Sequence, residues 1–185
     1  MGETLVLDLT KWAPSGQDIM KGDYLFQIQK GGKMVATGGG SGSQAIWPCR
    51  VVACLPGGES EVGKITQHRT NSSPEWIDIT MQFIAHADPE GFKAFIDLIG
   101  KTKRIDFDGF AGKVFGGSVA DNTYERKDKS GQKTGEMVTN MRITRTYPKA
   151  IFDEKLAEAQ NPAPNSIFST GPTAVAPTDD EDEEV

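Results

Sequence analysis

The chain has 185 residues, 37% of them hydrophobic and 25% charged, which suits one domain with a buried core. It contains no run of 18 apolar residues, and its first residues lack the basic and apolar regions of a secretory signal. We therefore expect neither a membrane span nor secretion, but a location in the cytoplasm, or the host cytoplasm if the protein is viral.

Strands are predicted along most of the chain, because short runs of alternating apolar and polar residues are separated by turns rich in Gly, Pro and Asn. In the run 76–84 the alternation turns Ile77, Ile79, Met81 and Phe83 inward and exposes Trp76. The predicted strands cover about 23–30, 46–55, 63–69, 76–84, 105–107, 113–124 and 136–147, and residues 1–21 are a possible short edge strand or arm.

Two helices are predicted. The first, at about 89–99, begins after the capping residue Asp88, has apolar residues at helical spacing and ends at Gly100. The second covers about 150–159 and ends before Pro162.

The order of strands, one interposed helix and further strands predicts a mainly β domain with one or two helices, an OB-like five-stranded barrel. A two-sheet β-sandwich is the alternative. We expect this domain to cover residues 1–160, followed by a linker rich in Pro, Ala, Ser and Thr at 161–178 and a disordered acidic tail at 179–185.

No motif for catalysis is present. The chain lacks a phosphate-binding loop, a Gly-x-Ser-x-Gly elbow and a His-Glu-x-x-His zinc motif. Cys49 and Cys54 have opposite parity in one predicted strand, which favours reduced thiols over a disulfide. We therefore expect no enzyme, no cofactor and no metal, and a metal-dependent nuclease using Asp106 and Asp108 is a minor alternative.

Basic charge is concentrated in residues 99–149, which hold 11 Lys and Arg against 6 acidic residues. Aromatic residues are interleaved with these bases, and single-stranded nucleic acid is bound by aromatic faces and cationic side chains together. Aromatics with apolar neighbours are assigned to the core instead: Tyr24, Phe26, Trp47, Phe83, Phe92 and Phe95. The nucleic-acid-binding candidates are Trp76, Lys101, Lys103, Arg104, Phe107, Phe110, Lys113, Tyr124, Arg126, Lys127, Lys129, Arg142 and Arg145. Core packing is the alternative for each candidate aromatic, and a solvated surface is the alternative for the bases.

The acidic tail carries the whole net charge of −6, because the preceding 178 residues balance 20 acids with 20 Lys and Arg. Like charges repel and prevent the tail from folding on itself. We expect it to bind partners and to compete weakly with a polyanion for the basic segment, with solubility alone as the alternative. The residues concerned are Asp179, Asp180, Glu181, Asp182, Glu183, Glu184 and Val185.

Four short segments carry a family resemblance, namely 22–26, 91–100, 110–115 and 140–143. They resemble small bacteriophage proteins of the replication and recombination modules, the single-stranded DNA-binding proteins and their relatives. The tail is similar to the acidic C-termini with which bacterial and phage members recruit replication enzymes, although those runs usually end in an aromatic residue and this one ends in Val185.

Together these features predict a sequence-independent single-stranded DNA-binding protein of phage replication and recombination. It would protect single-stranded DNA and recruit replication or recombination proteins through its tail. The alternative is a virion structural or decoration protein with a β-domain and a solvated tail. No membrane partner is expected, and a homo-oligomer is possible.

Overall fold

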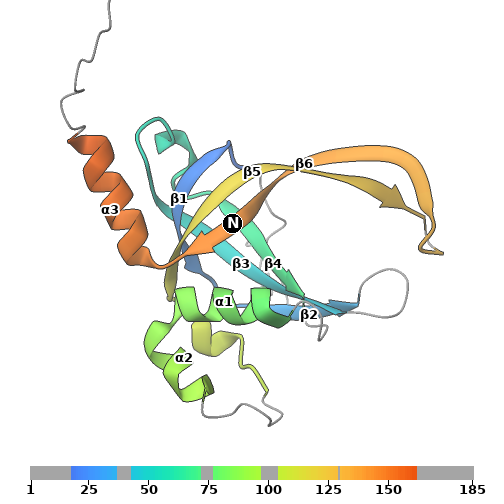
Figure 1. Ribbon diagram of the computed structural model, residues 1–185, viewed down its shortest axis with the longest axis horizontal. Coiled ribbons are helices and arrows are strands. Elements are labelled where there is room, and N and C mark those ends of the chain that lie inside the picture. The colour runs from blue at the N-terminus through green and yellow to red at the C-terminus, as the bar shows by residue number, and fades with distance from the viewer. Residues whose placement is uncertain (1–17, 37–42, 72–76, 97–103, 129, 162–185) are drawn as a thin grey trace, which may run out of the picture.

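The computed structural model describes residues 18–36, 43–71, 77–96, 104–128 and 130–161. Over these residues the chain is mainly β, with six strands in one antiparallel sheet (Figure 1). The strands are β1 Gly22–Ile28, β2 Lys33–Ala36, β3 Ser43–Cys54, β4 Ile65–Asn71, β5 Val114–Lys127 and β6 Lys133–Tyr147. The α-helices are α1 Ile77–Ala87, α2 Pro89–Ile96 and α3 Lys149–Gln160, and 3-10 helices cover Glu59–Glu61 and Asp108–Phe110.

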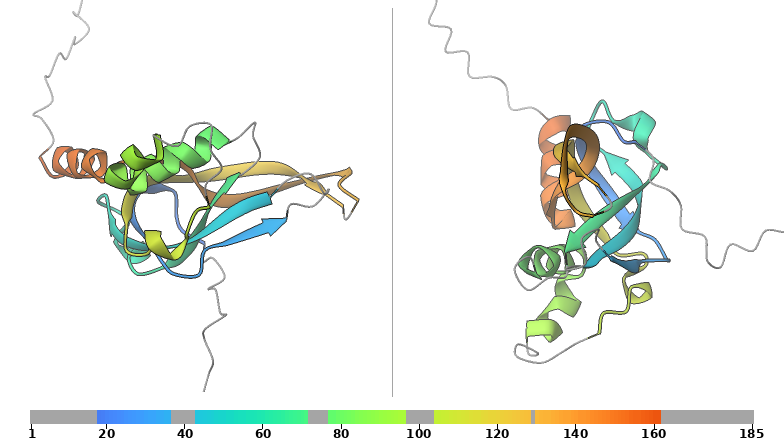
Figure 2. Two further views of the ribbon diagram at one scale, coloured as in Figure 1. Left: turned by 90° about the horizontal axis from the view of Figure 1, so that it is seen from below. Right: turned by 90° about the vertical axis from the view of Figure 1, so that its right-hand side faces the viewer.

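The strand order places β4 and β6 at the two edges of the sheet. β3 pairs with β4 along one side and with β1 and β2, end to end, along the other. β5 pairs with β1, and β6 pairs with β5. The sheet curves strongly, so β4 and β6 approach each other (Figure 2). The prediction of a mainly β domain is confirmed, but the strands form one open sheet and not a closed barrel.

Helix α1 spans the two edge strands at one end of the sheet. Thr80 Oγ1 donates a hydrogen bond of 2.6 Å to the carbonyl of Asn71, the last residue of β4. Nδ1 of His86, near the other end of the helix, lies 3.0 Å from Thr146 Oγ1 on β6. The gap between β4 and β6 is therefore bridged by a helix at this end.

The core contains a cluster of aromatic side chains between the curved sheet and α1. The Trp47 ring lies 5.0 Å from Phe83, 4.6 Å from Phe107 and 5.5 Å from Phe110 between centroids. Burying each large apolar side chain contributes about 1.5–3 kcal/mol to folding. The core assignments of Tyr24, Phe26, Trp47 and Phe83 are confirmed, and Phe92 is partly buried against this core.

His68 is a polar residue within this aromatic core. It is 6% exposed, and its ring lies 4.7 Å from Phe83 and 6.0 Å from Phe115 between centroids. Neither ring nitrogen has a hydrogen-bond partner among the described residues. Burial, with a smaller contribution from the charge of Arg142, lowers the pKa of His68 to about 3, so the ring is neutral near pH 7.

The helix α3 packs on the opposite face of the sheet. Its Phe152 is buried against Leu25 and Tyr147, which form a second, smaller apolar cluster. Lys155 donates a hydrogen bond of 2.8 Å to Asp23 on β1. The prediction of a helix at about 150–159 is confirmed, and the helix packs against β5 and β1, with Tyr147 at the end of β6.

Two predicted strands are wrong. Of the segment 76–84, the described part is helical and begins α1, because Thr80, Phe83, Ile84 and Ala87 form its buried stripe at helical spacing. Ile79 is consequently 47% exposed and not inward-facing. Residues 105–107 form no strand and lead into a 3-10 helix.

The predicted helix at 89–99 is confirmed over its described part as α2, and a second helix, α1, directly precedes it. Asp88 separates them, and its Oδ1 accepts a hydrogen bond of 3.2 Å from the backbone N–H of Gly91. Two helices therefore lie between β4 and β5 instead of the one expected.

Part of the predicted organisation falls outside the described residues: Trp76, most of the segment 1–21, nearly all of the linker 161–178 and the whole tail 179–185. The domain boundaries remain predictions. None of the helices in the described ranges is long and apolar enough to cross a bilayer.

Candidate functional site

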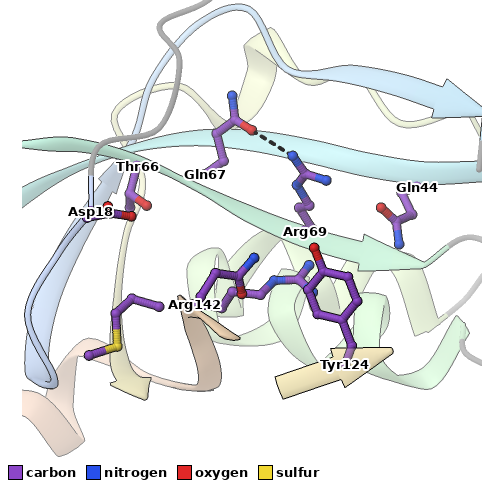
Figure 3. Close-up of a pocket in the computed structure, with 9 residues that line it drawn as sticks. Asp18, Gln44, Thr66, Gln67, Arg69, Tyr124 and Arg142 are labelled. Carbon is purple, nitrogen blue, oxygen red and sulfur yellow. Dashed lines mark hydrogen bonds between the residues drawn. The ribbon is translucent and has the colours of Figure 1, made fainter. Parts of the chain in front are cut away.

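A polar groove of about 510 Å³ lies between β4 and β6 (Figure 3). It occupies the gap between the two edge strands that α1 bridges at one end of the sheet. Its lining comes from five parts of the chain, namely the segment before β1 and the strands β3, β4, β5 and β6. The lining residues are Asp18, Gln44, Thr66, Gln67, Arg69, Tyr124, Asn140, Met141 and Arg142.

Two guanidinium groups line this groove from opposite edges of the sheet. Arg69 on β4 is exposed, and its Nη2 donates a long hydrogen bond of 3.4 Å to Gln67 Oε1. Arg142 on β6 is half-buried, and burial followed by the charge of Arg69 lowers its pKa. Among the described residues, no carboxylate lies within ion-pair distance of either guanidinium. Asp18 is the acidic residue in the lining.

Strand alternation explains how Arg69 reaches the groove. Its neighbours His68 and Thr70 are buried in the sheet interior, so Arg69 projects away from the core. Arg142 likewise precedes the buried Ile143 on β6. The sequence therefore orients each arginine locally, while the curvature of the sheet brings the two strands together.

Tyr124 provides an exposed aromatic ring in the same groove. It is 43% exposed and lies on β5 opposite Val138 of β6. Figure 3 shows its phenol oxygen directed toward the strand that carries Arg69. Asn122 and Asn140 form the next cross-strand pair on the same face, with a hydrogen bond of 3.4 Å between their side chains.

This arrangement is suited to bind an anion with several oxygen atoms. Two like charges in a partly dehydrated site repel each other, and an anion between them would relieve that repulsion. Arginine donors match phosphate and carboxylate oxygens in pairs, and an aromatic face beside them can stack on a planar ring. The amides of Gln44, Gln67 and Asn140 add neutral donors and acceptors.

Of the predicted binding residues, the structure brings Tyr124 and Arg142 together in the groove. Arg104, Lys127 and Arg145 are exposed elsewhere on the surface. Two other cations are paired: Lys113 Nζ lies 3.0 Å from Asp88 Oδ1, and Arg126 Nη1 lies 3.3 Å from Glu136 Oε2. The candidates outside the described residues are Trp76, Lys101, Lys103 and Lys129, together with the tail residues 179–185.

The candidate aromatics Phe107 and Phe110 pack against the core instead of lining the groove. Phe110 is buried, Phe107 is partly buried, and both rings contact Trp47. Both residues therefore follow the alternative interpretation given for the candidate aromatics, which was packing in the core. The 3-10 helix at Asp108–Phe110 causes this by directing Phe110 inward.

Sequence reasoning missed Arg69, which lies outside the basic segment 99–149. The alternation of the predicted strand 63–69 contained a usable signal, because it separates Arg69 from its inward neighbour His68. Gln44, Gln67 and Asn140 carry no comparable signal, since exposed amides are common on any strand.

No metal site accompanies the groove: within the described part of the chain, no three His, Cys, Asp or Glu side chains are grouped so that they could hold a metal ion. Asp106 and Asp108 are both exposed, and Asp106 Oδ1 accepts a hydrogen bond of 3.1 Å from the backbone N–H of Asp108. This contact is the usual stabilisation of a turn.

No protein-family model matches the chain, and no curated protein sequence matches it either.

Proposed function

We propose that this protein binds single-stranded DNA without reading its sequence, and that the groove between β4 and β6 is part of the binding surface. The observation that carries the proposal is the pair Arg69 and Arg142, two cations without a carboxylate partner among the described residues, beside the exposed ring of Tyr124. Cationic side chains and aromatic faces in one groove are the requirements for binding an unpaired strand.

The strand order supports this proposal. A five-stranded barrel of the OB type is partly open, and it binds oligonucleotides on the face of its second and third strands and on neighbouring loops. If β1 and β2 are taken as one interrupted strand, β3 and β4 correspond to that second and third strand. Gln44, Thr66, Gln67 and Arg69 come from these two strands. In the same count β5 is the fourth strand, and the helices α1 and α2 lie between the third strand, β4, and this fourth strand.

The chemistry of the groove supports binding through phosphates more than through base edges. Arg69 and Arg142 offer charged donors to a phosphodiester, and every base has a face that can stack on Tyr124. These contacts do not distinguish the four bases. The acidic tail 179–185 completes the proposal as the segment that recruits replication or recombination proteins of a phage.

The proposal is tested with a labelled oligo(dT) of about 20 nucleotides, which is longer than the roughly 4–16 nucleotides that one OB-type fold covers. We expect binding that weakens steeply with salt. Each of the substitutions Arg69→Gln and Arg142→Gln should reduce the slope of log K against log salt by about 0.7, the effect of one phosphate contact on a single strand.

Arg50→Gln is the matched control, because Arg50 is an exposed arginine on β3 that does not line the groove. We expect it to leave both affinity and slope nearly unchanged. Tyr124→Leu should cost about 1–3 kcal/mol of binding while keeping the slope, since it removes stacking and no charge. Absence of binding by the intact protein, or equal losses in Arg50→Gln and the groove variants, would contradict the proposal.

A further inference from the structure

The β5–β6 hairpin projects from the body of the protein as a two-stranded arm (Figures 1 and 2). β1 pairs with β5 only from Val114 to Val119. β6 continues to pair with β5 as far as the Lys127–Lys133 pair. Among the described residues, no strand covers the outer edge of β5 from 120 to 127.

The two edges of this arm differ in regularity. β6 contains extra residues where the register shifts, once near Thr144 and once around Gly135, whose φ is +80°. Such bulges disrupt a strand edge and hinder pairing with another chain. β5 has no extra residue at either shift, so its outer edge presents backbone N–H and C=O groups at regular spacing.

The charges along this edge are arranged so that a second copy fits in antiparallel orientation. Asp121 lies near the start of the open segment, and Arg126 and Lys127 lie at its end. Residues directly opposite each other in an antiparallel ladder point to the same face of the sheet, so the two-fold axis passes through a residue and its own copy. With the axis on Tyr124, Asp121 of each copy lies opposite Lys127 of the other. Asn122 then lies opposite Arg126 and Thr123 lies opposite Glu125, so no like charges face each other. Moving the axis onto Thr123 would place Asp121 opposite Glu125, which is unfavourable.

We propose that two copies of this chain pair through the outer edges of β5, forming a four-stranded antiparallel ribbon in the order β6, β5, β5, β6. A two-stranded ribbon is only marginally stable, and two added neighbours would hold the arm in place. The contact is isologous, as expected for a dimer with two-fold symmetry. It uses the strand edge and leaves the Tyr124 ring on a face of the ribbon.

The dimer should be weak and concentration-dependent, because two strand segments of this length bury less than the roughly 1,200 Å² of stable interfaces. Sedimentation velocity over protein concentrations up to about 100 µM, a range that covers micromolar dissociation constants, is therefore the measurement. The intact chain should shift from monomer to dimer. A chain that remains monomeric throughout would overturn the proposal.

Charge exchange tests the register. Asp121→Lys and Lys127→Glu should each be monomeric alone, because each places two pairs of like charges across the axis. An equimolar mixture of the two variants should dimerise again, since every facing pair is then of opposite charge. Monomers in the mixture, or dimers in either variant alone, would overturn the proposed pairing.

Glu136→Gln is the matched control for the arm itself. It changes the charge of β6 and removes the contact between Arg126 and Glu136, without changing a residue of the β5 edge. This variant should dimerise like the intact chain. The dimer does not depend on DNA, so its presence or absence is separate from the outcome of the oligo(dT) titration.

Discussion

Asp23 on the first strand accepts a hydrogen bond of 2.8 Å from Lys155 on the last helix. The same carboxylate accepts a bond of 3.1 Å from the Tyr147 hydroxyl, and one from Ser118 Oγ. One side chain thus connects β1, β5, β6 and α3. Burial raises the pKa of Asp23, but the hydrogen bonds from Lys155, Ser118 and Tyr147 outweigh it and hold the pKa below the ordinary 3.8.

Replacement of this carboxylate should destabilise the fold. We expect Asp23→Asn to lower the free energy of unfolding by about 1–3 kcal/mol at pH 7, the usual effect of losing hydrogen bonds to a charged group. Because the pKa of Asp23 is lower in the folded chain than in the unfolded chain, its carboxylate stabilises the fold at pH values above the ordinary pKa. This stabilisation is lost as the pH falls through the folded pKa. The difference between variant and wild type should therefore shrink below about pH 4.

Urea unfolding at several pH values measures this difference. Asp153→Asn is the control, because Asp153 pairs with Lys149 on the exposed face of α3 at 2.5 Å. Exposed pairs of this spacing contribute only about 0.3–0.5 kcal/mol. An effect of Asp23→Asn no larger than that of Asp153→Asn would show that the carboxylate does not hold α3 on the sheet.

His68 should make the protein sensitive to mild acid. Its pKa is lowered to about 3 by burial and by Arg142, whereas an unfolded histidine titrates near 6.5. Below pH 6.5 the unfolded chain binds a proton that the folded chain does not, so stability falls as the pH falls from about 6.5 toward 3. The slope approaches about 1.4 kcal/mol per pH unit for one proton.

His68→Phe keeps an aromatic ring in the core and removes the titration. Between about pH 4 and 6, its free energy of unfolding should vary less with pH than that of the wild type. His86→Gln is the comparison, because burial also lowers the pKa of His86 but that side chain is only partly buried. An unchanged pH profile in His68→Phe would mean that His68 is protonated in the folded protein.

Gly116 on β5 leaves room for the ring of Tyr147. A Cβ at this position would lie 2.1 Å from Cε2 of Tyr147. Gly116→Ala should therefore displace Tyr147 and cost about 1–3 kcal/mol, as overpacking does. Gly109→Ala is the control, since its Cβ would have ordinary contacts of 3.5 Å or more with Asp106. Thermal unfolding compares the two, and equal melting temperatures would contradict the close packing.

Removal of the tail should strengthen DNA binding if the tail competes for the cationic groove. Deleting residues 179–185 removes six carboxylates, so we expect tighter binding of oligo(dT) at low salt. The gain should shrink at about 0.5 M salt, where charges are screened within a few ångströms. A truncated chain with the affinity of the intact one would show that the tail has no competitor role.

The spacing of apolar residues predicted an element correctly where it fitted only one period, that of a strand or that of a helix. Tyr24, Phe26 and Ile28 lie on one side of the predicted strand and Asp23, Gln27 and Gln29 on the other, and β1 formed as predicted. In the segment after Pro74 the apolar residues satisfy both periods: Ile77, Ile79, Met81 and Phe83 alternate, while Phe83, Ile84 and Ala87 follow the helical spacing. The segment is a helix because its helical stripe packs against the aromatic core. This packing involves residues far away in the sequence, so the local pattern does not reveal it.

The sequence by itself determined the composition of the tail, the mainly β character and the orientation of Arg69 and Arg142 on their strands, because charge and alternation are properties of neighbouring residues. Only the tertiary structure decided which of these residues meet. The curvature of the sheet brings β4 beside β6 and creates the groove. Phe107 and Phe110 instead contact Trp47 in the core and do not line the groove. Such contacts join residues far apart in the chain, and they depend on the packing of the whole sheet.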